Sequence, residues 1–446
     1  MSNLALKGAR IIDPTTGVDG IGNVYVRDGV LLREPGTAGD YVTYDCRGLV
    51  LCPAFIDLHC HLREPGLEYK ETVATGTAAA AAGGFASVCA MPNTQPAYDS
   101  IENAVMAEEE HSADQMVHVY RIAAVTIGRK GHELVDMEAL ADYGVVGFSD
   151  DGDYVWDAVV MRDALLKAKL HGLPVIDHAQ DGALVTGGVM HDGEVSRRLG
   201  VQGMPAEAEE LAVGRDIALA RMTGAHVHIA HVTTARALEM VRVARAEGLH
   251  VTTEVTPSHL MLTDEDAVMV GADGRERFNT NAKVNPPLRT RADAFALQKG
   301  LMDGTIDAIA TDHAPHTETD KSGSPTEAAF GISAFETAIG AALTLCHEGK
   351  LTLERVIESL TVGPMQVLSG HGPTTALSDG EPAEFVLVDP NAIWTVDTSL
   401  FLSKGRNTPL AGRTLHGRVM ATFVDGSAAY WRNDIETRLV PGTEVA

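Results

Sequence analysis

Hydrophobic and polar positions change their pattern twice along this chain. Before residue 53, and again after residue 374, short apolar runs alternate with turn signals, a pattern typical of antiparallel β-strands. In the tail, one strand is expected to end at Asp389-Pro390 and another at Asp425-Gly426. Because the two regions share this character, we predict that residues 1–52 and 375–446 pair into one small β-sandwich domain.

The middle of the chain, residues 53–374, alternates strand-like apolar runs with longer helix-like stretches, which indicates a parallel α/β sheet. Eight such strands, each followed by enough residues for a helix, predict a closed (β/α)8 barrel of the TIM type. An open doubly wound sheet is the alternative, but no GxGxxG fingerprint follows the first strand. The expected strands are residues 51–58, 85–90, 117–122, 145–148, 174–177, 226–230, 251–255 and 306–310.

Composition and charge narrow the classes of partner. Of the 446 residues 45% are hydrophobic and 22% are charged, and the formal net charge is -26, which argues against nucleic acid and anionic membranes. The glycine-broken run over 72–91 predicts a helix and a strand rather than a membrane span, and the first residues lack the apolar core of a signal peptide. Five cysteines without a CxxC pair favour a reducing, cytoplasmic compartment.

Metal-binding residue types follow several of the expected strands. His59 and His61 lie two residues apart at the end of the first strand, so they share one face. Cys60 between them should face the other way as a packed thiol. A lone histidine after a strand is more often structural than a ligand, so the prediction depends on joint placement. The carboxyl ends of barrel strands meet at one rim, where the sequence also places Asp151, His178, His231 and Asp312.

Imidazole and carboxylate ligands together favour Zn²⁺ or a similar ion. Six ligands are more than one tetrahedral zinc needs, so the sequence predicts two Zn²⁺ ions bridged by Asp151, about 3.5–4 Å apart. Their positive charge would keep the pocket attractive to an anion within an acidic protein. Zinc lowers the pKa of bound water to about 7, and Asp312 is expected to take that proton and pass it to a leaving nitrogen. A plain ligand or a helix cap is the alternative for Asp312.

Further polar residues near these strands are candidates for holding a small-molecule substrate. Arg63 follows the histidine pair by two residues, and its guanidinium could clamp a carboxylate bidentately. A salt bridge at the rim is the equal alternative. Asn93 and Asn285 are candidate contacts that could also be simple turn residues. The polar, glycine-punctuated segment 316–331 could close over a ligand.

Six motifs together resemble those of the class I dihydroorotases in the amidohydrolase superfamily. They are DLHCHLREPG (57–66), MPNT (91–94), FSDDG (148–152), NPPLR (285–289), ATDHAPH (310–316) and FGI (330–332), and the similarity extends over nearly the whole chain. The resemblance implies the reversible cyclisation of N-carbamoyl-L-aspartate to L-dihydroorotate in pyrimidine synthesis.

The resemblance also implies a role for each matching residue. One zinc would be held by His59, His61 and Asp312 and the other by His178 and His231, with Asp151 bridging them. The substrate would contact His61, Arg63, Asn93, Asn285, His316 and the backbone at Phe330 and Gly331.

Three positions depart from the patterns of related enzymes. Hydantoinases and allantoinases usually bridge their metals with a carbamoylated lysine where this chain has Asp151. That difference favours a dihydroorotase and leaves occupancy of the second metal position open. Ser258 and Gln180 stand where dihydroorotases often have histidine and glutamate, but neither position is an expected ligand.

Two other functions stay open from the sequence. A hydantoinase, dihydropyrimidinase or allantoinase would not need Arg63, because its substrate lacks the dihydroorotate carboxylate. An inactive dihydroorotase-like partner of aspartate carbamoyltransferase should have lost metal ligands, whereas all six are present. The sequence does not decide whether the chain forms a homo-oligomer, and a complex with aspartate carbamoyltransferase is compatible with an active enzyme as well.

Overall fold

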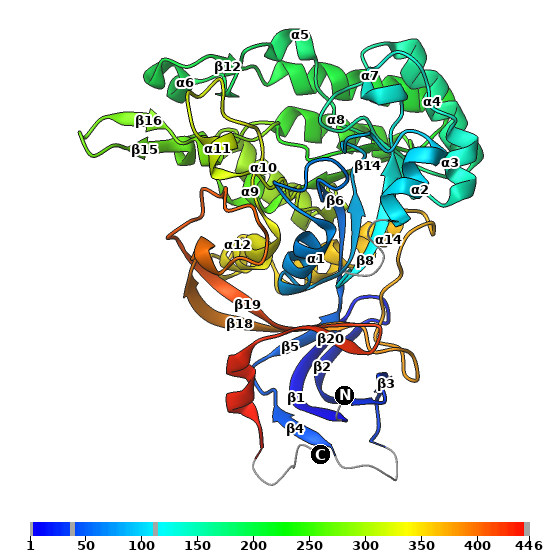
Figure 1. Cartoon of the computed structure of the whole chain (residues 1–446), viewed down its shortest axis with the longest axis vertical. Helices are drawn as coiled ribbons and strands as arrows, with labels where there is room; N and C mark the ends of the chain where they lie inside the picture. Colours follow the sequence, from blue (N-terminus) through cyan, green and yellow to red (C-terminus); the bar gives the residue numbers. More distant parts are fainter. Residues whose placement is uncertain (1–2, 36–40, 110–114, 441–446) are drawn as a thin grey trace.

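A barrel of parallel strands occupies the middle of the chain (Figure 1). The computed structural model describes residues 3–35, 41–109 and 115–440. Within them, the strand order along the barrel sheet follows the order in the sequence, and neighbouring strands are parallel. The predicted barrel is therefore confirmed. Its strands are β6 (Phe55–Cys60), β7 (Phe85–Ala90), β8 (His118–Ala123), β9 (Gly147–Phe148), β10 (Val175–Asp177), β13 (Val227–Ile229), β14 (Val251–Val255) and β17 (Ala308–Ile309).

The barrel closes where its first strand meets the segment after its last strand. Cys60 and His313 form a parallel bridge, and the His61 N–H donates to the His313 carbonyl at 2.9 Å. Below this bridge, the buried Asp57 accepts hydrogen bonds from the backbone N–H and the hydroxyl of Thr311, both at 2.7 Å. These contacts bring residues from opposite ends of the barrel sequence to the same rim.

Helices connect the strands and pack around the barrel. The first one, α1, begins after Thr72, whose hydroxyl accepts from the Thr75 N–H, and it is rich in buried alanine. No helix in the described residues is both long enough and apolar enough to cross a membrane. The main helices are α1 (Val73–Ala82), α2 (Ile101–Glu109), α3 (Met137–Tyr143), α4 (Ala158–Leu170), α7 (Glu207–Thr223), α8 (Ala235–Ala246), α10 (Arg291–Met302), α12 (Phe335–His347), α13 (Leu353–Leu360) and α14 (Val362–Val367).

Several connections are longer than a single helix. Those after β10 and β14 add short helices and two-stranded ribbons at the end of the barrel away from the small sheet (Figure 1). The additional elements are η1 (Ile127–Arg129), α5 (Gly182–Val185), β11 (Met190–His191), α6 (Glu194–Leu199), β12 (Gly203–Met204), α9 (Pro257–Met261), η2 (Asp264–Ala267), β15 (Val268–Val270), β16 (Glu276–Phe278), η3 (Thr280–Ala282) and α11 (Glu318–Lys321).

A second sheet combines strands from both ends of the chain and lies beside the barrel (Figure 1). The two ends meet where β5 pairs antiparallel with β18, and α12 of the barrel packs against β19. Its strands are β1 (Leu4–Asp13), β2 (Val18–Arg27), β3 (Val30–Leu32), β4 (Val42–Asp45), β5 (Val50–Pro53), β18 (Phe385–Thr395), β19 (Thr414–Val424) and β20 (Ser427–Trp431), with the short helices η4 (Thr398–Leu400) and η5 (Asn433–Arg438) beside them.

Most of the barrel strands differ from their predicted bounds by one or two residues, and two predicted strands differ by more than that. The apolar run expected to form one strand over 51–58 forms two, because β5 joins the small sheet and β6 begins the barrel after Ala54. The strand expected to end at Asp389-Pro390 continues to Thr395, and its register against β19 shifts between Asp389 and Ile393. The expected end of β19 before Asp425-Gly426 is confirmed.

Candidate metal centre and active-site cavity

The six predicted metal ligands lie at the carboxyl ends of barrel strands. His59 is on β6 and His61 follows it directly. Each of the others follows the end of its own strand by one to three residues: Asp151 after β9, His178 after β10, His231 after β13 and Asp312 after β17. All six are buried. The structure therefore brings together residues that are up to 253 positions apart along the sequence.

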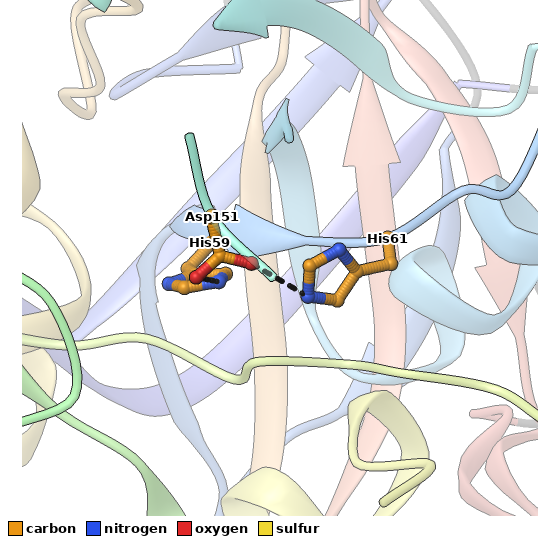
Figure 2. Close-up of side chains that lie close together, drawn as sticks. All are labelled: His59, His61 and Asp151. Carbon is orange, nitrogen blue, oxygen red and sulfur yellow. Dashed lines mark ion pairs between the residues drawn. The ribbon is translucent and has the colours of Figure 1, made fainter. Parts of the chain in front are cut away.

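Asp151 lies at the centre of this cluster. Its Oδ1 is 3.4 Å from His59 Nε2, 3.4 Å from His178 Nδ1 and 3.5 Å from His231 Nε2. Its other oxygen, Oδ2, is 3.5 Å from His61 Nε2, and Figure 2 shows the carboxylate between His59 and His61. The ligand atoms thus form two groups that share Asp151, one with His59 and His61 and one with His178 and His231.

Asp312 joins the first of these groups. Its Oδ1 is 3.0 Å from His61 Nε2 and 3.6 Å from His59 Nε2. In the second group, His178 Nδ1 and His231 Nε2 are 3.0 Å apart. Every ligand residue therefore turns a nitrogen or an oxygen towards the same small volume.

The residues present fit a metal centre. His59 Nε2 and Asp151 Oδ1 are buried and make no hydrogen bond, a costly arrangement for a polar protein interior. Their separation of 3.4 Å is long for a hydrogen bond. It matches two ligands of one tetrahedral zinc, which at about 2.0–2.1 Å from the ion lie roughly 3.4 Å from each other.

A cavity of about 200 Å³ opens beside the cluster. Five of the predicted ligands line it, while His59 is fully buried behind them. The cavity also brings together all the predicted substrate contacts: His61, Arg63, Asn93, Asn285, His316, Phe330 and Gly331. The small volume suits a compact substrate rather than a polymer.

Arg63 brings positive charge into the cavity. Its side chain is buried, its Nε donates to the Pro315 carbonyl at 3.3 Å, and one Nη lies 3.2 Å from His316 Nε2. Burial lowers the pKa of Arg63 to about 10, so the guanidinium stays charged at neutral pH. The predicted alternative of a salt bridge at the rim does not describe this position.

The sequence of this chain is similar to a family model over part of its length and to curated proteins along nearly its whole length. A family model described as dihydro-orotase-like matches residues 48–237. The dihydroorotase of Anaeromyxobacter sp. (strain K) is 46% identical over 426 residues, which cover 95% of this chain and 96% of the relative. The dihydroorotase of Syntrophus aciditrophicus is 41% identical, with 96% of this chain and 99% of the relative covered. This chain belongs to the dihydroorotase family.

This dihydroorotase-family chain has the same fold as several solved structures. The L-hydantoinase of Arthrobacter aurescens superposes with a TM-score of 0.83 at 22% identity, and the superposition covers 96% of each chain. The dihydropyrimidinase of Brevibacillus agri NCHU1002 superposes with a TM-score of 0.81 at 21% identity, covering 97% of this chain and 95% of the other. At this identity the likeness concerns the fold alone.

In this member of the dihydroorotase family, the cluster keeps its central carboxylate ionised. Burial alone would raise the pKa of Asp151, but the charge of His59 and the close approach of the neighbouring imidazoles hold it well below its usual range. In the same way, burial would lower the pKa of His59, and Asp151 and Glu254 raise it well above its usual value. An ionised carboxylate between imidazoles is the state that binds a cation.

The nitrogens that face away from the cluster are held by polar partners. His59 Nδ1 is 2.8 Å from Glu254 Oε1, His61 Nδ1 is 2.9 Å from Asn93 Oδ1, and His178 Nε2 is 2.9 Å from Gln180 Oε1. Such partners orient metal-binding imidazoles. The sequence interpretation missed Glu254 and gave Gln180 no role. One signal for Glu254 was available, since it is the one acid in strand β14, whose other residues are valine and threonine.

The segment between His316 and Gly331 borders the cavity and needs glycine at its end. Gly331 has φ +137°, and a Cβ there would come within 2.8 Å of the Ala314 Cβ and 3.0 Å of His316 Cδ2. His316 Nε2 also lies 2.7 Å from the Phe330 carbonyl oxygen. The backbone at residues 330–331 therefore approaches the cavity too closely for any side chain at Gly331.

Three non-glycine residues of the site have a positive φ. The angles are 64° at Arg63, 33° at His231 and 47° at Asp312. Left-handed backbone is costly for such residues and is concentrated at functional sites. The strain is consistent with side chains being held in position for a task other than stability.

Two neighbours of the predicted ligands have structural contacts instead. Asp150, beside Asp151, accepts hydrogen bonds from the N–H groups of Val125 and Thr126 at 2.8 and 3.0 Å. The Cys60 thiol is buried and donates to the Cys89 carbonyl at 3.4 Å, which agrees with the packed thiol expected from the sequence.

Proposed function

We propose that this chain is a dihydroorotase that interconverts N-carbamoyl-L-aspartate and L-dihydroorotate in pyrimidine synthesis. The observation that carries the proposal is that five ligand residues and Arg63 line one small cavity, while the sixth ligand, His59, contacts Asp151 behind them. Sequence identity of 41–46% to dihydroorotases over nearly the whole chain supports dihydroorotase activity.

The proposed centre holds two Zn²⁺ ions per subunit with Asp151 between them. His59, His61 and Asp312 would hold one ion and His178 and His231 the other, in line with the two groups of ligand atoms. Zinc supplies Lewis-acid chemistry when bound: it polarises a carbonyl group and lowers the pKa of water.

Asp312 is the proposed acid and base. Its carboxylate borders the cavity beside His61, and although burial would raise its pKa, the hydrogen bond from His61 and the nearby imidazoles keep the pKa below its usual value. As a carboxylate it can accept a proton from attacking water. It can then return that proton to the ring nitrogen that leaves when the cyclic amide opens.

The substrate carboxylate is proposed to bind at Arg63, which lines the same cavity. Arg63 offers the charge, while Asn93, Asn285, His316 and the backbone at Phe330–Gly331 offer hydrogen bonds. Burial and the charge of Arg63 lower the pKa of His316 to about 2, so its neutral ring adds no competing charge. A charge-assisted pair at this position would select substrates that carry a carboxylate.

The proton balance of the reaction gives a direct test. Ring closure converts a dianion and a proton into a monoanion and water, so lower pH should favour dihydroorotate, by about tenfold per pH unit. We expect the purified protein to approach this equilibrium from both sides. An equilibrium ratio that does not respond to pH would mean that the reaction is wrong.

The variant Arg63→Met separates this proposal from a hydantoinase-type activity. Loss of the charge-assisted contact should lower kcat/KM for dihydroorotate at least about tenfold. Hydantoin turnover that exceeds dihydroorotate turnover in the wild type, and that survives in the variant, would favour the rival. A well-folded wild type that binds no metal would favour an inactive partner of aspartate carbamoyltransferase.

We also propose a division into two domains, with residues 1–52 and 375–446 as a composite β-sandwich and residues 53–374 as the catalytic barrel. The five cysteines are all free, which supports a reducing compartment such as the cytoplasm. Size-exclusion chromatography, alone and with aspartate carbamoyltransferase, would test a homo-oligomer and a mixed complex.

A further inference from the structure

A line of polar side chains runs along two neighbouring barrel strands and ends at the metal centre. Alternate residues of a strand share one face. His226, which directly precedes β13, therefore lies on the same side as His228, and Thr252 and Glu254 lie together on β14. The strands are paired with His228 opposite Thr252. The reaction proposed above uses none of these four residues.

Hydrogen-bond contacts join the four residues to His59. Glu254 accepts at both oxygens, with Oε1 2.8 Å from His59 Nδ1 and Oε2 3.3 Å from His228 Nε2. The Thr252 hydroxyl oxygen is 2.8 Å from His228 Nδ1 and 2.7 Å from His226 Nε2. The line therefore extends from the amino end of β13, where His226 lies, to the ligands at the carboxyl end.

The donor and the acceptor in each contact can be assigned by starting from the Glu254 carboxylate. Glu254 is buried with one carboxylate oxygen facing each imidazole, and a carboxylate placed between two ring N–H groups accepts at both oxygens. Both facing nitrogens, His59 Nδ1 and His228 Nε2, must then carry the protons.

The same logic sets the rest of the line. His228 donates from Nε2 to Glu254, and when its ring carries this one proton Nδ1 accepts, so the Thr252 hydroxyl donates to it. The hydroxyl oxygen then accepts from His226 Nε2. Burial and the nearby His250 lower the pKa of His226 to about 2, which keeps this ring neutral, and its Nδ1 is a buried atom without a hydrogen bond.

The proton on His59 Nδ1 decides the state of the other ring nitrogen, Nε2. An imidazole that binds a metal is neutral, and with its one proton held on Nδ1 the lone pair of His59 lies on Nε2, the buried atom without a hydrogen bond 3.4 Å from Asp151 Oδ1. We propose that Glu254, His228 and Thr252 are positioning residues that together fix His59 in the tautomer whose Nε2 binds the metal.

Packing alone does not account for these residues. The interior of such a barrel is normally filled by branched apolar side chains, and buried polar groups lower stability unless each is satisfied. Within the line each donor faces an acceptor, and the line ends on a proposed ligand, while the outer nitrogen of His226 at the far end has no hydrogen bond.

Zinc affinity of the metal-free protein, measured by competition with a chelator, tests the inference. Glu254→Gln presents an N–H group to one of two imidazole donors, and we expect its zinc dissociation constant to rise by about 10–100-fold. Thr252→Val removes the donor to His228 with little change in shape, and we expect a rise of about tenfold, the low end of the same range. Thr252→Ser keeps the hydroxyl and should restore wild-type affinity.

Thr253→Val is the matched control, because the Thr253 hydroxyl donates to the Ile229 carbonyl at 2.8 Å on the same strand, outside the line. Its zinc affinity should equal that of the wild type even if its stability falls. Nitrogen-15 spectra of labelled histidine should show the His59 Nδ1 proton retained in Thr252→Ser and disturbed in Thr252→Val.

The inference rests on the proposed metal centre, but different results would overturn the metal centre and the positioning role. A wild type that binds no zinc would overturn the centre itself. A wild type that binds zinc while Thr252→Val binds it equally well would overturn only the positioning role. Equal weakening in Thr253→Val and Thr252→Val would also overturn it, because the effect would then be general destabilisation.

Discussion

Asp312 contacts the imidazole ligands His61 and His59, and it also lines the open cavity. It could therefore act both as a metal ligand and as a proton acceptor. Asp312→Asn keeps an oxygen that can bind a cation but removes the group that carries the proton. We expect zinc content to stay near that of the wild type and kcat for dihydroorotate hydrolysis to fall by about 100-fold or more. Metal analysis and initial-rate kinetics on the same preparation check this.

Asp153→Asn offers a control for that variant, since Asp153 is a nearby acid that pairs with Arg129 at 3.3 Å. It should retain most of the activity. Full activity in Asp312→Asn would remove Asp312 from proton transfer, and loss of zinc together with activity would reduce it to a ligand.

Single residues also show what the sequence could and could not predict. His59, His61 and Asp312 follow apolar runs directly, so the position of a strand end was enough to place them at one rim. Glu254 was missed because its contact with His59 depends on which strands are close across the barrel. Strand alternation within β14 does not reveal that.

At the scale of secondary-structure elements, the short helix α11 anchors the segment that borders the cavity. Lys321 at its end is buried, and its ammonium group donates to the carbonyls of Lys283, Ala329 and Gly331 at 3.1, 2.8 and 2.9 Å. Lys321→Met keeps the length of the side chain and removes these donors. We expect a loss of about 1–3 kcal/mol in the free energy of unfolding.

The same change should raise KM for dihydroorotate more than it lowers kcat, because the Gly331 backbone lines the cavity while the ligands stay in place. Urea unfolding and steady-state kinetics measure the two effects. Lys299→Met, at an exposed lysine over the Phe295 ring, is the control. An unchanged KM in Lys321→Met would show that the segment is held by other contacts.

Element boundaries mark the limit of the sequence pattern. β7 and β14 were predicted with the observed bounds, since β7 is a largely apolar run and β14 is rich in the β-branched residues valine and threonine. The run across Ala54 was not divided correctly because both halves are equally apolar and only pairing partners distinguish β5 from β6. A register shift let β18 pass through Asp389-Pro390, where turn chemistry alone predicted an end.

On the scale of the whole molecule, an ionic contact links the barrel to the small sheet. His118 Nε2, at the start of β8, is 3.5 Å from Glu384 Oε2 and 3.5 Å from Asp425 Oδ2, which flank strands of the small sheet. The hydrogen bond with Glu384 and the charge of Asp425 raise the pKa of His118 above 6.5. This contact should therefore stabilise the fold fully below pH 6.5 and be lost as pH rises through the raised value.

Replacing His118 with Asn should remove that pH dependence. Because the histidine side chain is 36% exposed, solvent screening limits the expected difference to about 0.2–1 kcal/mol. Thermal unfolding of wild type and variant at pH 5.5 and 8 would show a larger gap at the lower pH. His132→Asn, at an exposed histidine elsewhere, should give the same gap at both.

The pairing of β5 with β18 has a consequence for synthesis on the ribosome. The partner of β5 is encoded about 330 residues later, so at about 5–20 residues per second the first half of the small sheet waits roughly 20–60 seconds for it. Throughout that interval β5 presents an open edge, and such edges attract other chains. Nascent copies of this protein should depend on chaperones far more than the finished molecule does.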